Sequence, residues 1–368
     1  MQSFPLTAIT YTLALFFAFI FALMAERSKK GQNRIFYRNL SLMVIILFCG
    51  LRFFVGNDYY EYFRGFQSIS KYNLPFLEQR WEPGIYVLAQ IFKKSQFGYF
   101  LFLFSCNVIT YIFIFKVLVY NKTLKWGVFF TFTLGLLIMA NDQVRQGVSL
   151  SIFLFSIKYI EQNNFKKYIQ WIIIASLFHY SAIALIPVFF LKKIKLNSLI
   201  FSSLIIMTFL GYKFGIFYKY ILLLIEKIPY YGEIYVARMR FFQIEDSGSG
   251  LIILFNTLIA LFVALYYNKI NKPIYATLFL YGSIIAIFSV GYMPITRFSY
   301  FLVYTNIIVL PIMLKHNFNK LFTNGLIVIS FIYFFIVSLY GFEKHGAVPY
   351  RTILFENIVS PKSEYLTR

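Results

Sequence analysis

Long apolar runs recur along almost the whole chain and constrain its fold more than any other feature. The 368 residues are 60% hydrophobic and only 13% charged, which is roughly half the charged fraction of an ordinary soluble domain. Runs of about twenty apolar residues are long enough to cross a bilayer as helices. The sequence therefore predicts an all-α, polytopic integral membrane protein in which residues 1–368 form a single transmembrane domain.

Short basic segments between the apolar runs set the predicted orientation. Much of the net charge of +21 lies in such loops, as expected of cytoplasmic segments, so the charge does not predict a nucleic-acid partner. The basic segment 26–38 makes the first span run inward and the second outward. We expect about ten spans in total, with outer loops at 52–96 and 213–250 and an outer tail at 341–368.

The segment 168–191 interrupts this alternation. It is long enough for one span, but a single crossing would place the lysines that follow it on the outer side. A re-entrant hairpin with its tip at His179 keeps these lysines inside, and non-helical backbone is tolerated at membrane depth where it lines a cavity. We expect the hairpin, with a single span as the alternative.

Arginine is concentrated on the predicted outer face. Nine of the twelve arginines lie there, although lysine would satisfy the orientation rule equally well. A guanidinium group binds phosphate oxygens with two parallel hydrogen bonds, so we expect an anionic group to bind at this face. Arg52, Arg145 and Arg297 lie at the ends of spans, where a charge is costly unless it has a function or anchors the helix at the interface.

Arg52 is followed closely by Gly56 and Asp58. If the second span continues as a helix past Arg52, Gly56 lies one turn further and allows another backbone or a headgroup to approach closely. Arg52 would then bind a pyrophosphate, while Asp58 orients it or accepts a proton. The alternative is an arginine that extends to the interface and pairs with an acid there.

Two further residues are candidates for proton transfer. Glu82 precedes Pro83, a residue suited to the first position of a helix, so Glu82 is either a helix cap or a general base or sugar ligand. His179 lies in an apolar segment, where it is either a hydrogen-bonded core residue or a catalytic base.

Several motifs are absent from the sequence. It contains no glycine-rich phosphate loop, no Asp-x-Asp motif and no metal-ligand spacing of His, Cys and Asp. Cys49 and Cys106 both fall in apolar runs, so we do not expect a disulfide. The sequence predicts neither a metal nor a cofactor.

Taken in order, these motifs resemble the EpsG-type branch of the Wzy polysaccharide (O-antigen) polymerase family. The resemblance rests on Arg52-x-x-x-Gly56-x-Asp58, Glu82-Pro-Gly84, Arg145-Gln146, Phe178-His179-x-Ser181, Arg297 ahead of Tyr300-Phe301, and Pro349-Tyr350. It implies a GT-C-like glycosyltransferase of the bacterial plasma (inner) membrane. Such enzymes join undecaprenyl-diphosphate-linked oligosaccharide repeat units into O-antigen, capsule or exopolysaccharide on the outer face.

The implied reaction is displacement of a lipid diphosphate from an anomeric carbon by an acceptor hydroxyl. Such a site needs cations for the diphosphate and a base for the hydroxyl. The resemblance assigns the first role to Arg52, Arg145 and Arg297, the second to His179, Glu82 or Asp58, and weaker substrate contacts to Gly56, Gln146, Tyr300, Tyr350 and Arg351.

The expected partners are membrane lipid, a flippase and a chain-length-regulating membrane protein. Two other functions remain open, namely a transporter or flippase of the same lipid-linked oligosaccharide and a related membrane glycan ligase. The inverted repeat that many transporters carry is not detectable in the sequence.

Overall fold

The computed structural model describes residues 4–72, 81–194, 196–217, 250–290, 292–316, 320–336 and 346–354. Most of the predicted outer loop at 213–250 and of the predicted tail at 341–368 lies outside these residues. The described chain is almost entirely helical, as predicted, with one isolated antiparallel bridge between Arg52 and Thr352. It divides into two compact units, Met1–Ile186 with Leu314–Arg368 and Pro187–Met313.

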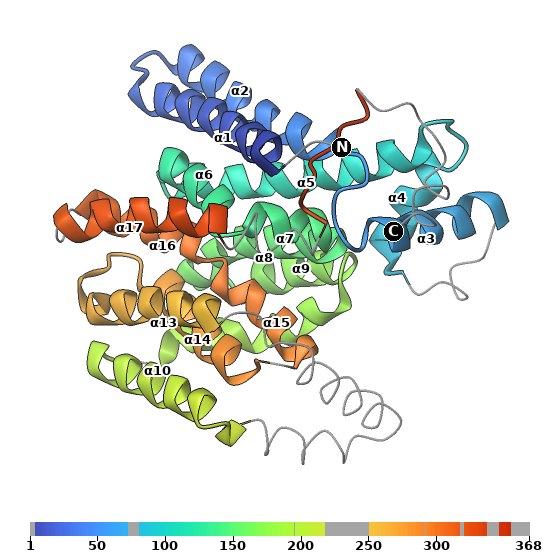
Figure 1. Cartoon of the computed structure of the whole chain (residues 1–368). Helices are drawn as coiled ribbons and strands as arrows, with labels where there is room; N and C mark the ends of the chain where they lie inside the picture. The colour runs from blue at the N-terminus through green and yellow to red at the C-terminus, as the bar shows by residue number, and fades with distance from the viewer. Residues whose placement is uncertain are drawn as a thin grey trace, which may run out of the picture. The chain divides into compact units, whose positions relative to one another are not determined.

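The first unit is a helical assembly built around two helical hairpins. Its helices are α1 (Phe4–Arg27), α2 (Gly31–Gly50), α3 (Tyr59–Tyr72), α4 (Pro83–Phe92), α5 (Gly98–Tyr120), α6 (Leu124–Thr133), α7 (Leu136–Asp142), α8 (Val144–Glu161), α9 (Phe165–Ser176) and α17 (Lys320–Tyr333). Helices α1 and α2 lie side by side (Figure 1), α1 also packs on α6, α2 packs on α5, and α8 packs on both α5 and α9.

Small residues explain the close packing of α1. Ala14, Ala18, Ala22 and Ala25 are all buried and recur every three or four residues, so they form one narrow stripe along the helix. Such stripes allow helices to approach closely in membrane proteins. The Ser41 hydroxyl of α2 donates a hydrogen bond of 2.7 Å to the carbonyl of Ala18, which fixes the two helices against each other.

The second unit contains α10 (Ser198–Lys213), α13 (Gly250–Leu265), the short 3₁₀-helix η3 (Tyr267–Lys269), α14 (Pro273–Phe288), α15 (Met293–Val303) and most of α16 (Asn306–His316). Helix α14 packs against α10, α13 and α15. A Cβ atom on Gly282 would lie only 2.6 Å from the backbone nitrogen of Val303, so glycine permits the contact between α14 and α15.

Three helical segments in the described part of the chain are long and apolar enough to cross a membrane. They are α1 (Phe4–Arg27), α5 (Gly98–Tyr120) and Pro294–Lys315, which combines α15 and α16. Helices α6 and α7 would make a fourth span, bent by 60°, and the left-handed φ of 78° at Gly135 accounts for the break. The predicted total of about ten spans stays a prediction, because the other apolar helices are shorter.

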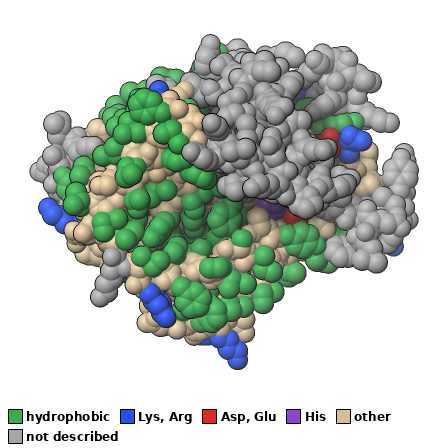
Figure 2. Space-filling model, turned by 90° about the horizontal axis from the view of Figure 1, so that it is seen from below, with side chains coloured by type: hydrophobic (Ala, Val, Ile, Leu, Met, Phe, Trp, Pro, Cys, Tyr) green, Lys and Arg blue, Asp and Glu red, His purple; other side chains and the backbone are tan. Residues whose placement is uncertain are grey.

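Exposed apolar side chains are consistent with a lipid environment. Leu13 and Phe16 of α1 are 50% and 55% exposed, and Met207 of α10 is 68% exposed. Hydrophobic side chains also cover much of the described surface on the face shown in Figure 2, with Lys and Arg side chains at its margins. Soluble monomers rarely expose apolar surface on this scale, so we conclude that the chain is an integral membrane protein.

The segment 168–191 reverses direction at His179. Helix α9 ends at Ser176, and the 3₁₀-helix η2 (Tyr180–Lys193) follows. The Tyr168 hydroxyl donates a hydrogen bond of 2.7 Å to the carbonyl of Leu185, although a straight helix would place these residues about 25 Å apart. The chain therefore forms a hairpin here. The re-entrant placement of this hairpin in a membrane stays a prediction.

Candidate functional site

Three of the predicted residues, distant in sequence, meet in one cluster. One carboxylate oxygen of Glu82, Oε2, lies 2.8 Å from Nη1 of Arg145. The other, Oε1, lies 3.0 Å from Nδ1 of His179. The Glu82 side chain is only 4% exposed, against 29% for Arg145 and 24% for His179. We call these three residues the carboxylate cluster; its acid is enclosed, and its two basic groups are accessible.

Helix α4 positions the acid. It begins at Pro83, as predicted, and Glu82 occupies the position before the helix. The Glu82 side chain makes no capping hydrogen bond, so helix capping does not account for this residue. Its oxygens instead bind groups from α8 and from the turn after α9.

Gly84 brings the turn that carries His179 against α4. Its N–H donates a hydrogen bond of 2.7 Å to the carbonyl of Leu177. A Cβ atom at this position would lie 2.8 Å from the same carbonyl oxygen, which is too close for any residue with a side chain. Gly84 belongs to the Glu82-Pro-Gly84 motif, but its role could not be predicted, because its neighbour Leu177 lies far away in the sequence.

Arg145 lies in the first turn of α8 and contacts Tyr62 of α3. Its backbone N–H donates to the Tyr62 hydroxyl at 3.4 Å, and its guanidinium carbon lies 5.9 Å from the centre of the Tyr62 ring. The Nε atom of Arg145 has no hydrogen-bond partner among the described residues. The guanidinium therefore retains hydrogen-bonding capacity beyond its contact with Glu82.

The charges of the cluster determine which nitrogen of His179 carries a proton. Burial raises the pKa of the Glu82 carboxyl, but the hydrogen bond from His179 and the charge of Arg145 outweigh burial and hold this pKa below its usual value. An ionised carboxylate can only accept hydrogen bonds, so Nδ1 of His179 must be the donor. In a neutral imidazole Nε2 is then the acceptor, and no described residue binds it.

Arg52 lies in a different and almost fully enclosed position. It is 1% exposed, and its Nη1 and Nη2 donate to the carbonyls of Cys49 at 2.6 Å and Asn141 at 2.9 Å. Helix α2 ends at Gly50, so it does not continue past Arg52, and Gly56 does not lie one helical turn further. The guanidinium instead ties the last turn of α2 to α7. Its role as a diphosphate ligand stays a prediction.

The C-terminal segment 346–354 folds back on the end of α2. Phe53 N–H donates to the carbonyl of Arg351, and Ile353 N–H donates to the carbonyl of Leu51, both at 2.9 Å. The Tyr350 ring stacks on Phe48 with centroids 4.5 Å apart. Tyr350 and Arg351 are 6% and 8% exposed. The tail thus becomes part of the packed structure around Arg52.

The EpsG family model matches residues 35–352 of the chain. The chain belongs to the EpsG family. The match includes the whole carboxylate cluster and confirms the resemblance seen in the motifs. This family is associated with glycosyltransferase-like polymerases of polysaccharide biosynthesis. No curated protein and no solved structure matches the chain.

Gly56 forms the turn between Arg52 and α3 with a positive φ angle. Its φ of +112° is one that other residues rarely adopt, and a Cβ atom there would lie 3.4 Å from the carbonyl oxygen of Asn141. Asp142 Oδ1 accepts the backbone N–H groups of Asn57 at 2.6 Å and Asp58 at 3.3 Å. Asp142 thereby holds this turn in place.

The remaining predicted site residues lie elsewhere. Asp58 directly precedes α3, and Gln146 is buried in α8 beside Arg145. Arg297 and Tyr300 lie on α15 in the second unit, and their predicted contacts with the substrate stay predictions. Among the described residues, no three His, Cys, Asp or Glu side chains gather closely enough to hold a metal ion.

Proposed function

We propose that this chain polymerises undecaprenyl-diphosphate-linked oligosaccharide repeat units on the outer face of the bacterial plasma membrane. The observation that carries the proposal is the carboxylate cluster, in which one buried acid holds an accessible histidine and an accessible arginine. Membership of the EpsG family supports the same reaction class. The proposal includes a multi-pass, GT-C-like arrangement of about ten spans, and O-antigen, capsule or exopolysaccharide as the product.

His179 is the proposed general base. The acceptor hydroxyl oxygen bonds to the anomeric carbon, and the bond from that carbon to the diphosphate oxygen breaks. The hydroxyl proton moves to Nε2 of His179, and the electron pair of the broken bond leaves with the lipid diphosphate. Glu82 accepts the hydrogen bond from Nδ1–H of His179. It thereby orients the ring and stabilises the imidazolium that forms.

Arg145 is the proposed cation for the departing diphosphate. Its guanidinium binds Glu82 through Nη1 and has further N–H groups for phosphate oxygens. Such preorganised donors act where negative charge develops in the transition state. Diphosphate contacts by Arg52 and Arg297, a proton-transfer role for Asp58, and contacts by Gly56, Gln146, Tyr300, Tyr350 and Arg351 belong to the same proposal.

We propose a metal-independent reaction, because the substrate already carries a good leaving group and two basic side chains accompany the acid. Polymerisation by membranes should then persist in EDTA. A loss of activity in EDTA that Mg²⁺ restores would contradict this part. Membrane lipid, a flippase and a chain-length-regulating membrane protein are the proposed partners.

The test is a gel of surface glycan from cells that lack the gene, with and without the gene on a plasmid. Collapse of the ladder to a single-repeat band, reversed by the plasmid, supports polymerisation. Loss of all surface glycan, with the lipid-linked repeat unit retained inside, would support a flippase or transporter instead. Polymer that stays on its lipid carrier would indicate a ligase, and an unchanged ladder would overturn the proposal.

A further inference from the structure

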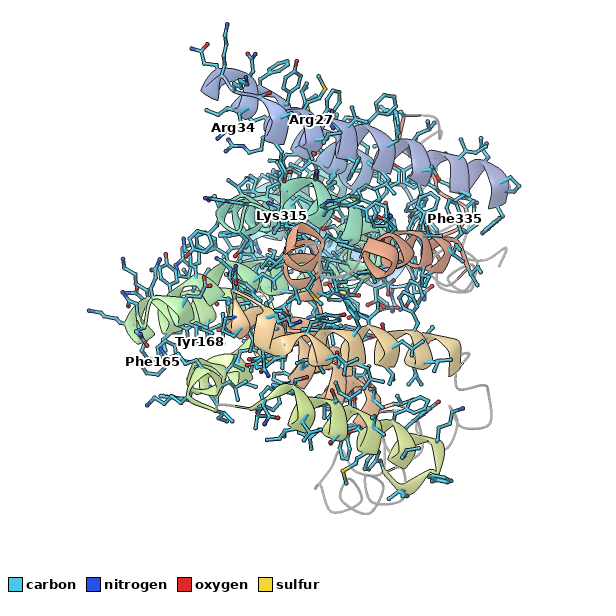
Figure 3. The ribbon with its side chains drawn as sticks, turned by 90° about the vertical axis from the view of Figure 1, so that its left-hand side faces the viewer. Arg27, Arg34, Phe165, Tyr168, Lys315 and Phe335 are labelled. Carbon is cyan, nitrogen blue, oxygen red and sulfur yellow. The ribbon has the colours of Figure 1, made fainter. Side chains whose placement is uncertain are left out.

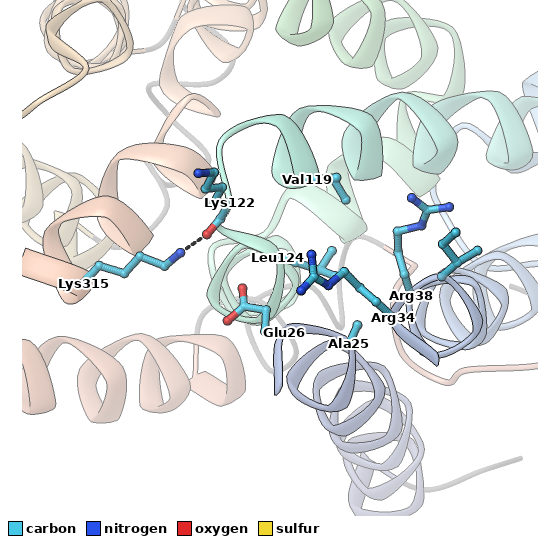
Figure 4. A pocket seen from close by; sticks show the side chains of 9 residues that line it. Ala25, Glu26, Arg34, Arg38, Val119, Lys122, Leu124 and Lys315 are labelled. Atoms are coloured by element: carbon cyan, nitrogen blue, oxygen red, sulfur yellow. Dashed lines mark hydrogen bonds between the residues drawn. The ribbon is translucent and has the colours of Figure 1, made fainter. Parts of the chain in front are cut away.

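A cavity of about 350 Å³ lies within the first unit, at the turns that join α1 to α2 and α5 to α6. Its charged lining residues are Glu26 of α1, Arg34 and Arg38 of α2, Lys122 of the α5–α6 turn, and Lys315 near the end of α16 (Figure 4). This volume falls in the range of about 300–1,000 Å³ that is typical of ligand sites.

The cations of this cavity are not neutralised by carboxylates. Four cationic side chains and one carboxylate line the cavity, which leaves a net charge of +3. The Glu26 carboxylate is itself engaged, because it accepts the backbone N–H of Lys125 at 3.1 Å and lies 4.0 Å from the Lys125 ammonium. Within the described chain, none of the four cations forms an ion pair.

The hydrogen bonds that these cations do make are to neutral groups. Arg34 donates to the carbonyl of Ser28 and Arg38 to the side-chain oxygen of Asn39, each at 3.3 Å. Lys315 donates to the carbonyl of Lys122. The guanidinium groups of Arg34 and Arg38 each have further N–H donors, so both can bind an anion.

The cavity lies at the ends of two helices that are long and apolar enough to cross a membrane. Glu26 lies in the last turn of α1, and Lys122 follows the end of α5. Arg34 and Arg38 lie near the start of α2, and Arg52 follows its end. Twenty helical residues rise about 30 Å, which matches the hydrocarbon core of a bilayer. In Figure 3, Arg34 lies on the left of the view, Phe335 on the right, and Lys315 between them. The cavity therefore lies at the level of lipid headgroups.

Exposed apolar side chains border the cations. Ile35 and Val119 line the cavity and are 51% and 40% exposed, and the neighbouring Phe36 is 59% exposed. A free inorganic anion would gain nothing from these residues, whereas a lipid could bind the cations with its phosphate and the apolar residues with its acyl chains. The ligand that fits both halves of the cavity is amphipathic.

We propose that this cavity binds the phosphate headgroup of an anionic membrane lipid in the inner leaflet. Arg34 and Arg38 bind the phosphate oxygens, Lys122 and Lys315 add positive charge, and Ile35 and Val119 contact an acyl chain. Basic pockets between membrane helices on the cytoplasmic side commonly take such headgroups. The inference does not depend on the proposed polymerase activity, because it uses none of the residues of the carboxylate cluster.

The test measures lipid that stays bound to the purified full chain, by native mass spectrometry after incubation with phosphatidylglycerol or phosphatidylcholine. Wild type should retain phosphatidylglycerol preferentially. The double variant Arg34→Gln/Arg38→Gln should lower that retention roughly tenfold or more. Lys29→Gln/Lys30→Gln is the matched control, because these lysines are exposed in the same turn and do not line the cavity. Its retention should change less than about twofold.

Three outcomes would overturn the proposal. Equal loss in the control variant would mean that diffuse surface charge binds the lipid. Equal retention of phosphatidylcholine would mean that the phosphate charge is not recognised. Displacement of phosphatidylglycerol by millimolar inorganic phosphate would mean that the site takes a soluble anion. If the double variant is not monodisperse, the single variant Lys315→Gln is measured in its place. Retention of phosphatidylglycerol by Lys315→Gln at the wild-type level would then contradict the site.

Discussion

Glu82 is the residue on which the carboxylate cluster depends. A carboxylate with 4% side-chain exposure is tolerated in a protein only when it is paired and hydrogen-bonded. Arg145 and His179 supply these partners, and each is in turn oriented by the acid. Removal of the acid therefore leaves the arginine and the histidine without the group that fixes their positions.

Glu82→Gln should remove this orientation while it preserves side-chain shape. The amide carries no negative charge, and its NH₂ group must face either Nδ1 of His179 or the Arg145 guanidinium, both of which are donors. We therefore expect polymer yield to fall roughly a hundredfold or more. The measurement is glycan chain length in cells with equal amounts of protein in the membrane. Glu61→Gln is the matched control, because Glu61 is 69% exposed and pairs with Arg64 at 3.5 Å. Wild-type polymer from Glu82→Gln would remove this acid from the site.

Arg145→Lys separates the effect of charge from that of geometry. Lysine keeps the positive charge but cannot bind Glu82 and a phosphate oxygen through one planar group. We expect activity to drop roughly tenfold to a hundredfold, with Arg64→Lys unchanged. Activity assays on membranes at saturating substrate would detect the difference. Full activity of Arg145→Lys would show that a point charge is sufficient at this position.

At the scale of elements, the contact between α4 and the turn after α9 determines the geometry of the cluster. Gly84 forms this contact, since any side chain there would overlap the Leu177 carbonyl. The two elements meet at the residues that precede His179. A change at Gly84 therefore acts on the distance between Glu82 and His179, not on either side chain.

Gly84→Ala should consequently impair activity without changing a cluster residue. We expect the added methyl group to push the turn away from α4 and to lower activity at least roughly tenfold. Gly325→Ala in α17 is the control, because no atom lies within 4 Å of a Cβ there, and alanine in a helix is neutral or stabilising. Equal activity of both variants would show that the α4 contact does not position His179.

Local signals predicted part of these elements. Pro83 predicted the start of α4, and the topology argument placed a chain reversal at His179. Helix α3 was missed, although buried Tyr59, Tyr62, Phe66 and Ile69 recur with helical spacing, because the segment was assigned to an outer loop. The apolar run predicts the second span over about residues 39–54, but helix α2 already ends at Gly50.

The contacts of the cluster could not be predicted in the same way. Glu82 lies 63 residues from Arg145 and 97 residues from His179. The packing of α4 on α5, of α5 on α8, of α8 on α9 and of Gly84 on Leu177 brings them together. The burial of Arg52 could not be predicted either. Its partners are backbone carbonyls, which every residue type carries.

At the scale of the whole molecule, the account requires the carboxylate cluster to face outward and the turn after α1 to face inward. Labelling with a membrane-impermeant maleimide tests this directly. Cys49 and Cys106 are both fully buried, so background labelling should be low. We expect Glu61→Cys to react in intact spheroplasts and Lys29→Cys to react only after lysis. The opposite pattern would place the cluster in the cytoplasm, away from the proposed substrate.

The most direct test of the proposed reaction is a glycan gel from cells that lack the gene and carry either wild type or His179→Ala. Membrane levels of the two proteins must be equal. We expect a full ladder with wild type and a single-repeat band with His179→Ala, because Nε2 of His179 takes the proton of the acceptor hydroxyl. A full ladder with His179→Ala would contradict the proposed base and the site built around Glu82.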